Sequence, residues 1–60
     1  MSSSQLRLLE CALKAANAAA QGEIDLDTAK RIYGGARRAG VDPKALRPAR
    51  IELLRLEDRA

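Results

Sequence analysis

The residues of this chain that are best suited to chemistry are basic, and most of them lie in its middle. Between Lys30 and Arg47 there are six Lys and Arg residues and a single Asp, and a Gly-Gly pair interrupts them. Guanidinium and ammonium groups bind carboxylates and phosphates through charge-assisted hydrogen bonds. We therefore expect a contact surface for an acidic protein or a nucleic acid. The candidate contact residues are Lys30, Arg31, Gly34, Arg37, Arg38, Arg47 and Arg50.

An α-helix is the element that would position these side chains. Wound as a helix, the stretch from Thr28 to Arg38 places its apolar and basic side chains on two faces. Gly34 lies among the basic side chains, and the only aromatic residue, Tyr33, lies on the apolar side. The apolar face, which we expect to lie in the core, consists of Leu26, Ala29, Ile32, Tyr33 and Ala36.

Residues that most catalytic and metal sites need are missing from the sequence. There is no His and one Cys, so we expect neither a zinc site nor a His-dependent mechanism. Glu23, Asp25 and Asp27 are explained as the start of a helix, where acidic side chains cap amides and favour the helix dipole. We therefore expect no enzyme activity, no metal, no cofactor and no small-molecule substrate.

The single cysteine also indicates the cellular compartment of the protein. Cys11 cannot form an internal disulfide, which favours a reducing environment. No apolar run approaches the roughly 20 residues that cross a membrane, and the start Met-Ser-Ser-Ser-Gln lacks the features of a signal peptide. We expect a cytoplasmic protein without a membrane partner. Its Ala- and Arg-rich composition is typical of GC-rich bacterial or phage genomes.

The first predicted helix spans residues 4–21. Ser3 or Ser4 would cap its first amides, and Gly22 would close it in a left-handed conformation. The second helix is predicted from Leu26 or Asp27 to about Ala39. Its boundaries are set by Asp25 as the cap and Gly40 as the closing residue.

Two prolines shape the last segment. Asp42 would cap a helix with Pro43 in its first position. Because Pro48 lacks an amide donor, either a short turn at 43–46 precedes a new helix at Pro48, or one bent helix runs to about Arg59.

The Gly34-Gly35 pair has three explanations from sequence. Two glycines inside a helix cost roughly 2 kcal/mol relative to alanine. They would kink or break the helix, admit a neighbouring helix that a side chain would block, or open the basic face to a contact.

These elements predict an all-α fold in which residues 1–60 form one small bundle of three helices and residues 1–3 are flexible. So small a core stabilises a fold by only about 3–5 kcal/mol, which favours completion of the bundle by self-association. The candidate apolar interface consists of Leu6, Leu9, Leu13, Leu53 and Leu56.

The segment from Ile32 to Ile51 resembles a helix-turn-helix. Ala36 is small, Gly40 follows four residues later at the turn, and Leu46 stands where the second helix would pack. The run Ala-Arg-Arg-Ala-Gly-Val is similar to the first helix and turn of repressor-type domains. This resemblance implies the alternative function, a DNA-binding regulator that uses residues 30–50.

Surplus apolar surface makes protein–protein binding the expected function. The first and last helices each carry apolar side chains on two faces, more than a bundle of this length covers. Stripes of Leu are buried in helix-in-groove complexes, and a basic rim would steer an acidic partner. We expect a small bacterial or phage regulator, inhibitor or accessory subunit that binds a larger protein, a second copy of itself, or both.

Overall fold

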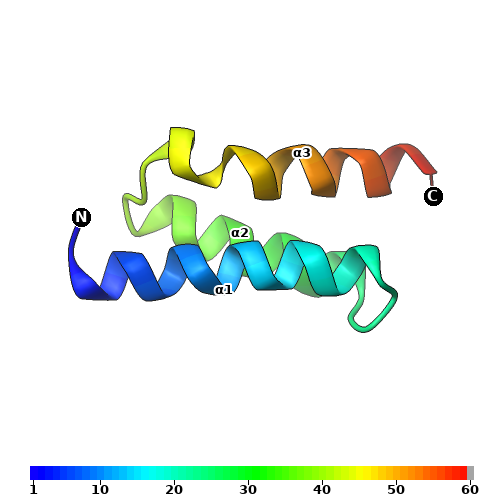
Figure 1. The fold of residues 1–60 in the computed structure, drawn as a ribbon, viewed down its shortest axis with the longest axis horizontal. Coiled ribbons are helices and arrows are strands. Elements are labelled where there is room, and N and C mark those ends of the chain that lie inside the picture. The colour runs from blue at the N-terminus through cyan, green and yellow to red at the C-terminus, as the bar shows by residue number, and fades with distance from the viewer. Residues whose placement is uncertain (60) are drawn as a thin grey trace.

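The fold is a bundle of three helices, which confirms the all-α prediction. The computed structural model describes residues 1–59, and these form α1 (Ser3–Ala20), α2 (Leu26–Arg38) and α3 (Pro43–Arg59). The helices run up, down and up, so that the two termini lie at opposite ends (Figure 1). All three pairs of helices are in contact, most extensively α1 with α2 and least extensively α2 with α3.

The dimensions of the bundle fix the direction of its helices. At 1.5 Å per residue, α1 and α3 are each about 26 Å long. The molecule measures 34 × 18 × 14 Å along its principal axes. Both helices must therefore lie along the long axis, as Figure 1 shows, with α2 beside them.

A capping box starts α1 one residue earlier than the sequence predicts. The Ser2 hydroxyl accepts a hydrogen bond from the Gln5 amide (3.2 Å), and the Gln5 side chain accepts one from the Ser2 amide (3.0 Å). The prediction of Ser3 or Ser4 as the cap was wrong, because only Ser2 has a Gln three positions later. Gln5 also donates to the Ala39 carbonyl (3.1 Å), which ties the start of α1 to the end of α2.

Glycine closes α1 and α2 in the same way, as predicted. Gly22 and Gly40 have φ of +76° and +86°, a region that side chains rarely adopt. After each glycine the chain folds back on the helix, with hydrogen bonds from Glu23 to Ala18 (2.9 Å) and from Val41 to Ala36 (3.1 Å). Val41 is buried against α2 as a result.

The starts of α2 and α3 also lie at the predicted caps. Asp25 occupies the N-cap position of α2, although its side chain makes no capping hydrogen bond. Asp42 caps α3 by accepting from the Lys44 amide (3.0 Å), and Pro43 is the first helical residue.

Of the two alternatives for Pro48, the structure has the single helix. α3 continues through Pro48, so the prediction of a short turn followed by a new helix was wrong. Pro48 leaves the Lys44 carbonyl without its usual partner four residues later. In Figure 1 the first turn of α3 is offset from the rest of the helix, which agrees with a bend there.

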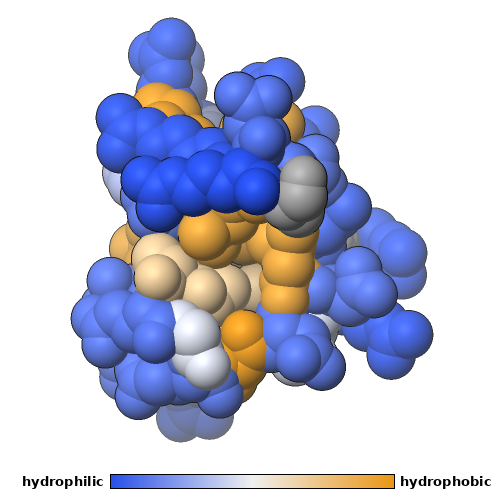
Figure 2. Space-filling view, turned by 90° about the vertical axis from the view of Figure 1, so that its right-hand side faces the viewer, coloured by the Kyte–Doolittle hydropathy of each residue, from blue (hydrophilic) through white to orange (hydrophobic). Residues whose placement is uncertain are grey.

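The core is small and consists largely of alanine. One cluster of buried residues is Ala15, Ala16, Ala29, Ala49 and Leu53, and the other is Ala12, Ala36, Val41 and Leu46. Ile32 and Tyr33 are half-buried and pack against both clusters. Figure 2 looks onto the end of the bundle where α3 ends and shows apolar surface framed by hydrophilic side chains. The core is therefore incompletely covered at this end.

The glycine pair has no packing role in the fold. α2 is unbroken at Gly34 and Gly35, and a Cβ added at either would meet no atom within 4 Å. The explanations by a helix break and by a closely packed neighbouring helix were therefore wrong. The expected cost in helix stability has no compensating contact within the described part of the chain.

Replacing Gly34 or Gly35 by Ala is expected to stabilise the protein by about 0.5–1 kcal/mol, because alanine favours the helix and loses less backbone entropy on folding. Thermal unfolding followed by circular dichroism should show a rise in Tm of about 4 °C.

Gly40→Ala is the matched control. At a φ of +86° a side chain is strained, and a Cβ at this position would lie 3.3 Å from the Gln5 side-chain nitrogen. This variant should lose stability. A comparable loss in Gly34→Ala would contradict the prediction and show that α2 needs glycine there.

Candidate binding groove between two helices

The fold divides the predicted basic residues between two surfaces. A groove between α2 and α3, with a volume of about 370 Å³, is lined by Lys30, Tyr33, Arg37, Arg50, Leu53, Leu54 and Glu57. The outer face of α2 carries a second open pocket, with a volume of about 670 Å³, lined by Asp27, Lys30, Arg31, Gly34 and Arg38. Lys30 borders both surfaces, and Arg47 lines neither of them.

Apolar side chains of different exposure line the groove. Leu53 is 6% exposed and belongs to the core, whereas Leu54 is 52% exposed. Tyr33 comes from the facing side of α2 and is half-buried. α2 and α3 make the least extensive contact in the bundle, and Leu54 and part of Tyr33 are accessible to solvent between them.

Charged groups flank this apolar surface. Arg37 donates a hydrogen bond to the Tyr33 hydroxyl (3.2 Å), and its guanidinium carbon lies 6.0 Å from the centre of the Tyr33 ring. This contact holds the Arg37 side chain over the aromatic ring. Arg50 faces it from α3. Neither guanidinium has a carboxylate partner within residues 1–59.

Lys30 is the cation of the groove that does have a partner. Its ammonium group pairs with the Glu57 carboxylate, which joins α2 to α3. The hydrogen bond to Glu57, and then the charge of Glu57, raise the pKa of Lys30 above its ordinary value of 10.5. Because both side chains are more than 40% exposed, water and salt screen the pair and its contribution to stability is small.

The groove combines cationic side chains with an apolar wall. Two guanidinium groups remain available for carboxylates, and Leu54 and Tyr33 offer apolar surface beside them. Arg and Tyr are also enriched among the residues that dominate binding energies at protein interfaces. A segment with acidic and apolar side chains on one face would pair with the guanidinium groups and cover the apolar surface.

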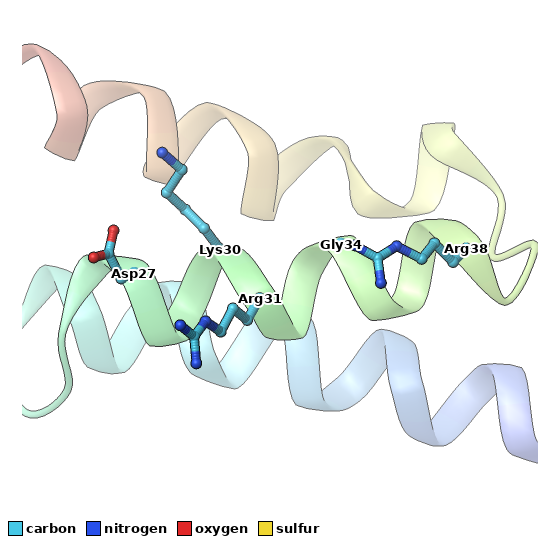
Figure 3. Close-up of a pocket in the computed structure, with 5 residues that line it drawn as sticks. All are labelled: Asp27, Lys30, Arg31, Gly34 and Arg38. Atoms are coloured by element: carbon cyan, nitrogen blue, oxygen red, sulfur yellow. The ribbon is translucent and has the colours of Figure 1, made fainter.

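The outer face of α2 has a different character. Figure 3 shows the side chain of Arg38 running back along α2 to Gly34, whereas Lys30 points toward α3. Arg31 and Arg38 have no ion-pair partner among the described residues. No large apolar residue lines this surface, so it resembles a site for charge alone.

The apolar interface residues predicted from sequence are mostly covered by the fold. Leu53 is a core residue, and Leu9, Leu13 and Leu56 are half-buried. Only Leu6, at 47% exposed, remains open. Leu53 packs against residues of α1 and α2 in the core and also lines the groove.

Other side chains of α3 are exposed instead. Ile51 is 44% exposed and lies beside Leu54 on the outer side of the helix. The sequence shows a second apolar stripe on this helix, but it does not say which stripe faces inward. Glu57 was also missed as a groove residue, because its pairing with Lys30 depends on how α2 and α3 are placed.

The helix-turn-helix resemblance extends only to the turn. In such motifs the two helices are inclined at about 90–120°. Here α2 and α3 lie side by side along the long axis of the bundle (Figure 1). Gly40 makes the expected turn, but the crossing geometry is absent from the described chain.

Comparison of the chain with models of known protein families, with curated proteins and with solved structures found no match. Within residues 1–59, no group of three or more Cys, Asp and Glu side chains could hold a metal ion. In the same range, no helix has both the length and the apolar character to span a bilayer.

Glu57→Gln is expected to lower the pKa of Lys30 toward 10.5, because Glu57 supplies both the main hydrogen bond and the charge that raise it. An NMR titration of the Lys30 side chain measures this shift directly. An unchanged pKa would contradict the ion pair.

The same pair predicts a pH dependence of stability. The pKa of Lys30 is higher in the folded than in the unfolded state, so the stabilisation is complete below about pH 10.5 and is lost as pH rises through the folded value. The stability difference between the wild type and Glu57→Gln should therefore shrink at higher pH. A difference that stays constant would contradict this assignment.

Proposed function

We propose that this chain is a small non-catalytic protein-interaction module that binds an acidic, amphipathic segment of a larger protein in the groove between α2 and α3. The observation that carries the proposal is the pair Arg37 and Arg50, which face the groove without carboxylate partners beside Leu54 and Tyr33. A carboxylate bound here would pair with two guanidinium groups that have no carboxylate partner within residues 1–59.

The shape of the groove favours a helical or extended segment. Two roughly parallel walls, α2 and α3, border the apolar side chains, as in complexes that bury one face of an amphipathic helix. Positive charge at the rim would speed the encounter with an acidic partner and fix its orientation. Half-exposed Leu54 would then become buried, which supplies the apolar part of the binding energy.

A role as a regulator, inhibitor or accessory subunit agrees with this size and surface. The module would act by covering a segment of its partner with this binding surface. The single cysteine favours a cytoplasmic site of action, and the composition favours a bacterial or phage origin.

The proposal predicts a preference for acidic over basic amphipathic helices. A labelled helical peptide with Leu at positions i, i+3, i+4 and i+7 and Glu beside them should bind, as followed by fluorescence anisotropy at low salt. The same peptide with Lys in place of Glu should bind at least about tenfold more weakly. Equal binding of the two peptides would contradict the proposal.

A matched pair of double variants locates the binding surface. Arg37→Glu with Arg50→Glu should weaken binding of the acidic peptide by about tenfold or more. Arg31→Glu with Arg38→Glu changes the net charge equally but leaves the groove intact, so it should retain most of the affinity. Circular dichroism checks that both variants remain folded. The opposite ranking of the two variants would place the contact elsewhere.

Nucleic-acid binding is the second candidate function, and the outer face of α2 favours it. Arg31 and Arg38 flank Gly34 on a surface without large apolar residues (Figure 3), as expected for contacts with phosphates. The absence of a helix-turn-helix crossing makes base reading by α3 a poor explanation, so this binding would depend on charge.

The same two double variants test the second candidate. Labelled duplex DNA should bind at low salt with an affinity that falls steeply as salt is added. Arg31→Glu with Arg38→Glu should abolish this binding, and Arg37→Glu with Arg50→Glu should affect it less. An absence of binding at low salt would refute the second candidate and leave the first unaffected.

A further inference from the structure

The outer side of α3 carries a stripe of four exposed residues that no other part of the described chain covers. These residues are Arg47, Ile51, Leu54 and Asp58. Their spacing of four, three and four positions places them on one side of the helix. The stripe lies opposite the buried side chains of Leu46, Ala49 and Leu53. The fold therefore holds α3 with its second apolar stripe toward solvent.

The order of these residues is complementary to itself when read in reverse. About a point between positions 52 and 53, Ile51 is symmetric with Leu54, and Arg47 is symmetric with Asp58. A second copy of α3 laid antiparallel against the first would place Ile51 opposite Leu54 twice. It would also place Arg47 opposite Asp58 at both ends of the contact.

We infer that a second copy of this chain covers the outer side of α3, in a two-fold symmetric dimer with antiparallel α3 helices. Two-fold symmetry presents the same patch on both partners, which requires a patch complementary to itself. A parallel arrangement would oppose Arg47 to Arg47 and Asp58 to Asp58. The charges therefore select the antiparallel arrangement as well as the partner.

Features of the single chain support this assignment. Ile51 and Leu54 are 44% and 52% exposed, the two highest values among the large apolar residues of α3. Asp58 lies in the last turn, where the helix dipole disfavours a negative charge, and it has no ion pair within residues 1–59. A basic side chain of the second copy would pair with the Asp58 carboxylate and offset its unfavourable interaction with the helix dipole.

Two further arginines lie at the edges of the contact and outside its apolar centre. Arg50 and Arg55 are also symmetric about the same point, but they lie on opposite flanks of the stripe. Arg50 lines the groove toward α2, and Arg55 pairs with Glu52, which lies toward α1 (4.0 Å). The two-fold axis places Arg50 of both copies on one edge of the contact and Arg55 of both copies on the other edge. Arg50 therefore does not face Arg55 of the second copy, and the two residues of each like pair are offset by about 7.5 Å along the helices.

Sedimentation equilibrium tests the inference over protein concentrations from about 10 µM to about 1 mM, since interfaces of this small size are weak. The wild type should form dimers within this range. Ile51→Ser should shift the equilibrium strongly toward monomer without loss of helicity, because this side chain is exposed and lies outside the groove. A wild type that stays monomeric throughout would overturn the inference.

Charge reversal gives the sharper test. Arg47→Asp and Asp58→Arg should each weaken the dimer at least about tenfold, because each variant opposes like charges at both ends of the contact. Both changes favour the dipole of α3, so the fold should be retained. An equimolar mixture of the two variants should recover dimers close to wild-type affinity. In a mixed dimer, both contacts between position 47 of one copy and position 58 of the other again join opposite charges.

Each outcome of the mixing experiment decides the question. Recovery in the mixture, with monomers in each variant alone, supports the antiparallel α3 dimer. Dimers that persist in both single variants, or a mixture that stays monomeric, would overturn it. Arg7→Asp, an exposed change on α1, is the control for net charge and should leave the dimer intact. The two charge-reversal variants leave the groove lining unchanged, because Arg47 and Asp58 do not line it.

Discussion

Close approach of α1 to both other helices is the constraint on which the rest of the bundle depends. Ala12, Ala15 and Ala16 form the buried side of α1, and their short side chains let α2 and α3 pack against it. α2 and α3 then touch one another least. The groove between them is the consequence, and it exposes the larger side chains of Tyr33 and Leu54. A core rich in alanine thus creates a binding surface by leaving its bulkier residues outside.

The helix boundaries were predictable because single residues with one physical role set them. Gly40 supplies a positive φ that few other residues adopt, and Asp42 with Pro43 starts a helix by capping and by a fixed φ. The cap of α1 was harder to predict, since three adjacent serines compete and the choice falls to a Gln three positions later. The sequence left two alternatives at Pro48, because it shows the lost hydrogen bond but not the packing of α3 on α1. In the structure this packing outweighs the lost hydrogen bond, and α3 is a single helix.

The candidate site was predicted only in part, since it depends on relations between helices. A helical wheel places Arg37 and Arg38 on the same basic side, but they are neighbours about 100° apart. Contact with Tyr33 holds Arg37 toward α3, whereas Arg38 lies over Gly34 on the outer face. Nothing in the sequence around residue 30 indicates Glu57, because only the placement of α3 brings that carboxylate to Lys30.

Leu54 couples the two surfaces of α3. It lines the groove toward α2 and also belongs to the outer stripe with Ile51. A partner segment that covers Leu54 from the groove removes part of the apolar area available to a second copy, and a second copy does the same to the partner. Two binding events that share a side chain in this way oppose each other, and the coupling acts equally in both directions. A monomer–dimer equilibrium would therefore set how much of the groove is open to a partner.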